Sequence, residues 1–347
     1  MIYSFVIAGG ALLAYITEKI RSKKVLFILA LLLSLFCGLR GITVGTDTSN
    51  YCYYLRYVTT YGISFTKEIG YSICAYLFMS IFSNPHYFLL TMSTITIFLI
   101  VYRLWDFHDR ASFCLMIVIF EIMYYQYTFN IARQFLAIAI VFWASRYLER
   151  NKIKKFIIAV AIAMLFHATA FLGLFFLLFD FSGNSGIRIR PIYILFAFLS
   201  LILFSLLEQR LSGYSVYFES KSFVLNEVTV LRMLLLLLVL FSNKLRTNAH
   251  FSRSLDGNYI PIEKWIYRLY LVGLTLSCAS MFFPFMNRIG FYYCMFEMPF
   301  WGQAVKAKKN KGVFISLILA LLIFSFINNI SGEFDGIMNY VTFLNQQ

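Results

Sequence analysis

The sequence predicts an all-α protein that crosses a membrane many times, and two observations about composition support this fold class. Hydrophobic residues make up 61% of the 347 residues and charged residues only 13%, whereas a soluble domain has roughly 45–50% apolar and about 25% charged residues. The apolar residues also form long continuous runs, and a spanning helix needs about 20 such residues. Composition therefore excludes a water-soluble enzyme, and the long runs exclude a β-barrel, whose strands alternate apolar and polar residues.

The basic residues supply the third observation. The net charge is +14, and the basic side chains gather in short loops between the apolar runs, near 18–24, 146–155, 243–264 and 305–311. Loops of this kind lie on the cytoplasmic side of a membrane. Because no nucleic-acid-binding motif accompanies the charge, we expect no nucleic-acid partner.

The apolar runs predict about 12 transmembrane helices in a single transmembrane domain, 1–347. Stretch 155–181 is too long for one span and is predicted to enter and return as a hairpin of two short half-helices, with its tip near 166–169. Counting crossings from the cytoplasmic loops places a long loop, 42–68, on the outer side. The same count leaves no net crossing for the helix at 69–83, which is then either re-entrant or interfacial, unless 51–65 crosses too. The remaining predicted spans are 2–17, 25–41, 86–103, 111–127, 129–147, 190–207, 223–242, 264–283, 289–304 and 312–330.

Polar residues from distant parts of the chain map to the outer boundary of these spans or just beneath it. Ionisable residues at membrane depth are costly, and by default they indicate a functional site. The sequence therefore predicts an outward-facing site built from Arg40, Asp47, Asn50, Glu68, Asn130, Arg133, Gln134, His167, Asn287 and Arg288.

Two arginines in this set favour recognition of phosphate or pyrophosphate. Arg133 lies one turn into an apolar helix and shares a face with Asn130 and Gln134, and a guanidinium binds phosphate oxygens in a bidentate manner. Arg288 follows Asn287 at the same predicted depth, with Tyr292 one turn beyond. The alternative for each arginine is an interfacial anchor that reaches the lipid headgroups.

Three other residues are candidates for acid–base chemistry or sugar binding. His167 lies at the predicted break of the hairpin, where it would act as a base or bind a phosphate oxygen, or serve only structure. Asp47 lies in a glycine-rich outer loop before Tyr51; the carboxylate is a candidate base and the tyrosine a candidate sugar contact, unless the loop is an ordinary turn. Glu68, near Tyr71, is a similar candidate or simply an acid at a helix N-terminus.

No P-loop, dinucleotide-binding, HExxH, GxSxG or EF-hand pattern is present. This argues against an ATP-driven pump and a zinc protease. The outward set holds few carboxylates, and two arginines can replace a cation, so we expect no metal and no cofactor.

Taken together, these segments resemble the EpsG family of Wzy-type polysaccharide polymerases. The resemblance spans about residues 38–300, and one departure is Ile69, where the family usually has proline. The matching elements are Gly45-Thr46-Asp47 with Tyr51 and Tyr54, the Glu-x-Gly-Tyr segment at 68–71, Arg133-Gln134 at a helix start, the segment 166–170, and Asn287-Arg288 with Tyr292.

The resemblance implies a GT-C-like fold and a glycosyltransferase of the bacterial inner membrane with a periplasmic active site. Its substrate would be undecaprenyl-pyrophosphate-linked oligosaccharide, polymerised into O-antigen, capsule or exopolysaccharide, and a flippase and a chain-length regulator are possible partners. Arg133 and Arg288 would stabilise the leaving pyrophosphate, and Asp47 or His167 would be the general base. The alternatives are a flippase or transporter for lipid-linked glycans and an O-antigen ligase.

Overall fold

The computed structural model describes residues 2–63, 68–179, 181, 225–244, 263–307, 311–332 and 336–345. Over these residues the chain is helical, and its one β-type pairing is an isolated bridge between Arg40 and Thr342. The elements are α1 (Ile2–Ile20), α2 (Lys23–Gly38), α3 (Thr48–Tyr61), α4 (Ile69–Ile81), α5 (Pro85–Trp105), α6 (Phe113–Met123), α7 (Tyr127–Asn130), α8 (Ala132–Glu149), α9 (Ile153–Met164), the 3-10 helix η1 (Ala168–Leu178), α12 (Glu227–Lys244), α13 (Lys264–Ala279), α14 (Phe285–Cys294), α15 (Glu297–Ala307), α16 (Lys311–Ser331) and the 3-10 helix η3 (Phe343–Asn345).

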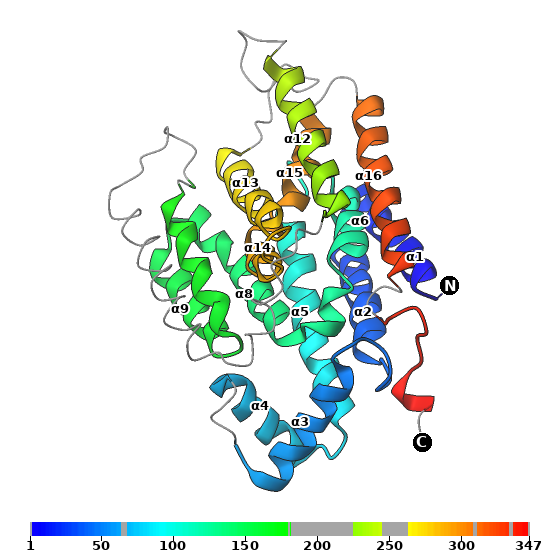
Figure 1. Cartoon of the computed structure of the whole chain (residues 1–347), viewed down its shortest axis with the longest axis vertical. Coiled ribbons are helices and arrows are strands. Elements are labelled where there is room, and N and C mark those ends of the chain that lie inside the picture. The colour runs from blue at the N-terminus through cyan, green and yellow to red at the C-terminus, as the bar shows by residue number, and fades with distance from the viewer. Residues whose placement is uncertain are drawn as a thin grey trace.

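The helices pack as an elongated bundle around a large apolar core, and a second, smaller apolar cluster lies where α3 and α4 meet α5 (Figure 1). Helix α5 contacts α2 on one side and α8 on the other, α8 also contacts α9, and α1 contacts α2 and α6. In the C-terminal half α13 contacts α14, and α12 contacts α16. Helices α3 and α4 pair with each other at one end of the bundle, below α5 in Figure 1. We call this the site end and the opposite end the basic end.

Local signals in the sequence fix where α5 begins. The side chain of Asn84 accepts a hydrogen bond from the backbone N–H of His86 at 3.0 Å, and Pro85 occupies the first turn, where its missing N–H costs nothing. Among the described residues α5 is the one helix long and apolar enough to cross a membrane, and α4, α6, η1 and 315–331 are shorter apolar helices. An all-helical architecture of this kind is consistent with a membrane protein, but the twelve predicted spans are not confirmed.

Four predicted segments differ from the structure. The outer loop 42–68 contains α3, and the predicted span 289–304 is broken between α14 and α15. The predicted span 111–127 contains only the 11 residues of α6 before the turn that leads to α7. The hairpin 155–181 does break at 165–167 as predicted, but its second half is a 3-10 helix. Segment 190–207 and most of loop 243–264 lie outside the described residues.

Candidate active site

A charged pair between two distant helices lies at the centre of the site end. Arg133, the second residue of α8, places Nη1 2.5 Å from Oε2 of Glu68, the residue that precedes α4. The ring centroids of Tyr71 and Tyr51 lie 5.3 and 6.0 Å from the guanidinium carbon, within the range of a cation–π contact. The side chains of Arg133 and Glu68 are 24% and 19% exposed, so the pair is shielded but reachable.

His167 connects this pair to α14. It stands in extended backbone between α9 and η1, with Nε2 4.0 Å from Oε1 of Glu68 and Nδ1 2.7 Å from Oγ1 of Thr169. The Thr169 hydroxyl lies 3.1 Å from the hydroxyl of Tyr292. Thr169 was not predicted as a site residue, because a threonine beside a candidate histidine carries no signal of its own.

The turn that carries Asp47 is fastened to the start of α8. Oδ1 of Asn130 accepts a hydrogen bond from the backbone N–H of Thr46 at 2.9 Å, and the Tyr51 hydroxyl donates to the Asn130 carbonyl at 2.9 Å. Gly45 has φ +81°, and a Cβ there would lie 2.5 Å from Oδ1 of Asn130. Glycine is therefore required both by the backbone conformation and by the close approach.

Asp47 is half-buried between the two arginines. Burial raises the pKa of its carboxyl above the usual value, while the positive charges of Arg288 and Arg133 act in the opposite direction. The carboxylate makes no capping hydrogen bond to α3. Burial therefore gives this carboxyl a higher proton affinity than that of an exposed aspartate, and the charges of two arginines oppose the effect.

Gln134 and Arg288 join α8 to α14. The Gln134 side-chain amide, which is buried, donates to the Arg288 carbonyl at 2.9 Å. The Arg288 side chain is partly exposed, and Asn287 beside it is also partly exposed. Arg133, Gln134 and Arg288 therefore lie in one place, as the sequence predicts.

Arg40 occupies a different position from the one expected of a substrate-binding residue. Its side chain is completely buried, and it donates to the hydroxyls of Thr48 and Ser93 and to the carbonyls of Cys37 and Phe129. These bonds hold the ends of α2, α5 and α7 together beneath the site. The geometry gives Arg40 a structural role.

The C-terminal segment braces the Asp47 turn from the other side. The backbone N–H of Gly45 donates to the Gly336 carbonyl at 3.0 Å, and that of Gly41 donates to the Val341 carbonyl at 2.8 Å. The N–H of Phe343 donates to the Leu39 carbonyl at 3.0 Å. This brace was not predicted, because hydropathy assigns spans but does not identify which segments lie next to one another.

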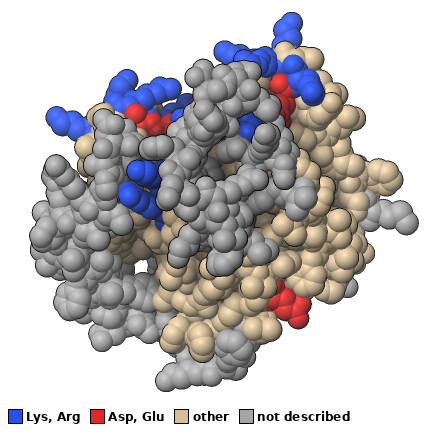
Figure 2. Space-filling model, turned by 90° about the horizontal axis from the view of Figure 1, so that it is seen from above, with Lys and Arg blue, Asp and Glu red and all other residues tan. Residues whose placement is uncertain are grey.

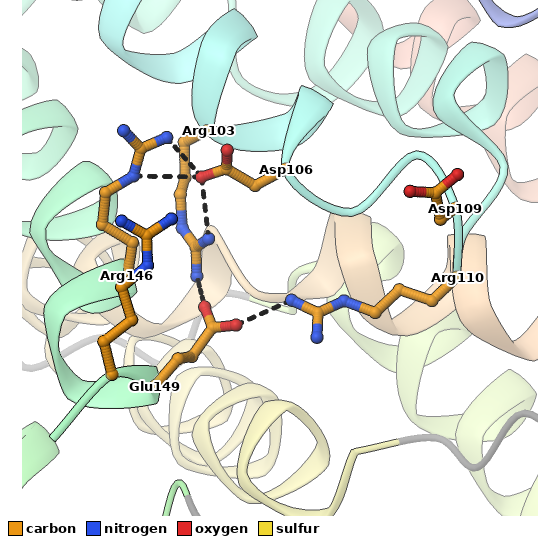
Figure 3. Close-up of a pocket in the computed structure, with 7 residues that line it drawn as sticks. Arg103, Asp106, Asp109, Arg110, Arg146 and Glu149 are labelled. Atoms are coloured by element: carbon orange, nitrogen blue, oxygen red, sulfur yellow. Dashed lines mark hydrogen bonds and ion pairs between the residues drawn. The ribbon is translucent and has the colours of Figure 1, made fainter.

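A second charged cluster lies at the basic end (Figure 3). Figure 2 looks onto this end, where Lys and Arg side chains gather with a few carboxylates. Asp106 bonds to Arg103 and Arg146, Glu149 to Arg103 and Arg110, and Arg110 also to Glu263. We call these six residues the ion-pair ladder. Part of it lines a cavity of about 360 Å³ together with Asp109 and Arg150.

The ladder was not predicted: Arg146 was assigned only to a cytoplasmic loop, and Arg103 and Arg110 were not singled out. A buried pair between Arg232 and Glu297, 3.2 Å apart, was missed for a related reason: both lie inside apolar runs. The hydroxyl of Tyr270 and the indole N–H of Trp301 each donate to Glu297 at 3.3 Å. This group ties α12 to α13 and α15.

The all-helical fold, with its apolar helices, is consistent with a membrane protein. A model of the EpsG family matches residues 23–342, nearly the whole chain. The protein belongs to the EpsG family, a Wzy-like polymerase family of polysaccharide biosynthesis. Comparison with curated proteins and with solved structures returned no match.

Proposed function

We propose that the protein polymerises lipid-pyrophosphate-linked oligosaccharide repeat units at the periplasmic face of the bacterial inner membrane. The observation that carries the proposal is the convergence of Asp47, Glu68, Arg133, His167 and Arg288 from five separate segments at one end of the bundle. Family membership supports the polymerase class. The undecaprenyl carrier and the choice among O-antigen, capsule and exopolysaccharide belong to the proposal.

The charge distribution supports the periplasmic orientation of the site. The ladder, Arg150 and the short connection after α8 lie at the basic end, together with Lys306, whose Nζ donates to the carbonyl of His108 at 2.7 Å. Positive loops favour the cytoplasm. With the basic end inside, the site end faces out, where lipid-linked repeat units meet after export.

The reaction is a glycosyl transfer between two lipid-linked chains. An acceptor hydroxyl on the new repeat unit attacks the anomeric carbon of the growing chain. The bond from that carbon to the pyrophosphate oxygen breaks, and the lipid pyrophosphate leaves with the bonding electron pair. The hydroxyl proton passes to a base, and the chain becomes longer by one unit.

Arg133 and Arg288 stabilise the charge that develops on the leaving pyrophosphate. A preorganised donor of this kind contributes on the order of 10²-fold to the rate. Glu68 holds Arg133 in place, and His167 joins Glu68 to the hydroxyls of Thr169 and Tyr292. Glu68 and His167 therefore position the arginine that contacts the leaving group.

Asp47 is the general base in this proposal. Its carboxylate lies among the arginines that bind the pyrophosphate, so the acceptor hydroxyl and the leaving group meet beside it. Burial raises the pKa of Asp47 and so strengthens it as a proton acceptor. His167 is instead engaged with Thr169 through Nδ1.

The test is the length distribution of surface polysaccharide in a strain that lacks the protein and is complemented with variants. Wild type is expected to restore a ladder of repeats. Arg133→Ala is expected to leave a single-repeat product, because the charge on the leaving group loses its partner. Arg150→Ala, an exposed arginine at the basic end, is the matched control and is expected to restore the full ladder.

Two results would contradict the proposal. Normal polymer length with Arg133→Ala at normal membrane levels would remove Arg133 from the site. Loss of every repeat-bearing product in the deletion strain would indicate export or ligation instead of polymerisation, and the accumulating lipid-linked intermediate would distinguish a flippase from an O-antigen ligase.

A further inference from the structure

Helix α4 presents an aliphatic stripe on its exposed face. The stripe repeats every four residues and therefore follows one side of the helix. Its members are 43%, 39%, 58% and 75% exposed. An aliphatic face of this kind, at the end of an apolar bundle, fits lipid acyl chains. The four residues are Ile69, Ile73, Leu77 and Ile81.

Helix α3, the partner of α4, has the same spacing on its exposed face but a different chemistry. Tyr53, Tyr57 and Tyr61 are 74%, 40% and 73% exposed, and the rings of Tyr57 and Tyr61 lie 4.7 Å apart. We call these three residues the tyrosine track. The aliphatic residues of α3, Leu55 and Val58, are fully buried.

The other exposed residues of α3 are polar. They include Asn50, Arg56 and Thr60. An interfacial helix that lies in lipid buries aliphatic or tryptophan side chains on its apolar face, and the exposed face of α3 has none. The contrast with α4 therefore argues that α3 faces water and a partner that accepts tyrosine rings together with polar groups.

A carbohydrate chain matches this face. A pyranose presents an apolar C–H face to an aromatic ring and hydroxyls around its rim, and tyrosine offers a flat ring with a polar hydroxyl. Residues four apart in a helix rise by about 6 Å, which is close to the length of one sugar residue. Successive tyrosines can therefore contact successive sugars of an extended chain.

The tyrosine track is continuous with the candidate site. Asp47 immediately precedes α3, and Tyr51 on the opposite face of the same helix donates to the Asn130 carbonyl. The hydroxyl of Tyr54 bonds to that of Ser72 at 2.6 Å, which fixes α3 against α4. Figure 1 shows α3 leading away from the bundle at the site end.

We infer that the tyrosine track binds the growing polysaccharide chain and keeps it at the site between successive additions. This inference rests on the proposed function, because it requires a polymer that grows beside Asp47. Retention raises the effective concentration of the chain end at the site. The track then sets chain length, whereas Asp47 and the arginines set the rate of each addition.

The experiment compares two triple variants of the track, all three tyrosines changed to Ala or all three to Phe, in the deletion strain and in membranes. Each ring lost is expected to speed release of the chain by about fivefold, so the Ala variant makes markedly shorter polymer. The Phe variant retains the rings and is expected to restore most of the length. Formation of the first linkage is measured with lipid-linked single repeats extracted from the deletion strain, and both variants are expected to match wild type because a single repeat remains at the site.

The double variant Ile73→Ala, Leu77→Ala provides the matched control, since both residues are exposed on α4, the helix that pairs with α3. Wild-type length in the triple Ala variant would overturn the inference, as would equal shortening by the α4 control. A fall in membrane level with unchanged length per molecule would assign the tyrosines to membrane anchoring and would also overturn it. If the wild-type protein forms no linkage, the proposed function fails. If the wild-type protein polymerises and the track variants make polymer of the same length, only the inference fails.

Discussion

Helix α8 carries charged residues at both of its ends, and the two ends are built differently. At the basic end Glu149 bridges Arg103 and Arg110, and Asp106 bridges Arg103 and Arg146. With Glu263, three arginines meet three carboxylates in one closed, neutral network. Each charged side chain of the ladder therefore has an oppositely charged partner within the protein itself.

The site end of α8 has fewer ion pairs and more neutral polar groups. Arg133 pairs with Glu68 alone among the described carboxylates within ion-pair distance, and its other neighbours include aromatic rings. The hydroxyl of Tyr71 is buried with no hydrogen-bond partner among the described residues. A buried polar group without a partner costs free energy, and natural proteins retain such groups mainly where they have a use. The denser ion pairing of the ladder is consistent with a role in stability, and the sparser pairing of the site end is consistent with the proposed binding role.

The largest expected effect tests the chemistry at the site end. Asp47→Asn removes the proton acceptor while preserving the shape of the side chain, and it is expected to lower the rate of linkage formation by about 10³-fold. His167→Asn is expected to cost far less, because His167 acts through Glu68. The measurement is the rate of two-repeat product with extracted lipid-linked repeats. Equal losses in the two variants would remove the distinction between base and positioning residue.

The second prediction, of intermediate size, concerns the ladder and affects the stability of the fold instead of the reaction rate. Arg103→Met leaves Asp106 and Glu149 with one guanidinium each at a site where Arg103 is 1% exposed, so the free energy of unfolding is expected to fall by about 2 kcal/mol. The linkage rate per folded molecule should stay at the wild-type level. Thermal unfolding in detergent measures the first quantity and the two-repeat assay the second. Arg150→Met is the control. A loss of linkage rate in Arg103→Met with an unchanged free energy of unfolding would contradict the assignment of the ladder to stability.

The smallest expected effect is a shift in pH dependence. In the proposed mechanism linkage formation requires the Asp47 carboxylate, so the rate is expected to fall as pH drops through the raised pKa of Asp47. Arg288 lowers that pKa; Arg288→Gln removes this influence and is expected to move the acid limb of the rate profile to higher pH. Rate against pH for the two proteins gives the comparison. An acid limb that stays in place, or moves to lower pH, would show that Asp47 is not the titrating base.

The sequence predicted which polar residues lie near one another better than the elements that carry them. Arg133, His167 and Arg288 were chosen because each interrupts an apolar run near a predicted outer boundary, and the structure brings them together with Glu68 and Asp47. Helix α3 was predicted as a loop, because tyrosines, threonines and an arginine leave no apolar run to detect. The break between α14 and α15 falls within continuous apolar sequence, where composition gives no signal.

The sequence could not predict which helices and segments lie side by side. Hydropathy orders the spans and assigns their sides, but it does not say which spans touch. The brace on the Asp47 turn, the Thr169–Tyr292 contact and the ion-pair ladder all join segments far apart in the chain. Arg40 was assigned to substrate for the same reason, since its four buried partners become visible only in three dimensions.

The brace from the C-terminal segment has a consequence for biosynthesis. Tyr340 donates to the carbonyl of Phe36, 304 residues earlier, and its ring stacks on that of Phe36. The turn that holds Asp47 is therefore among the first parts of the chain to emerge from the ribosome and among the last to be secured. A chain halted before residue 336 would carry Asp47, Arg133 and Arg288 without the support that holds the Asp47 turn. In the proposed function, the Asp47 turn is therefore secured only after translation has passed α16.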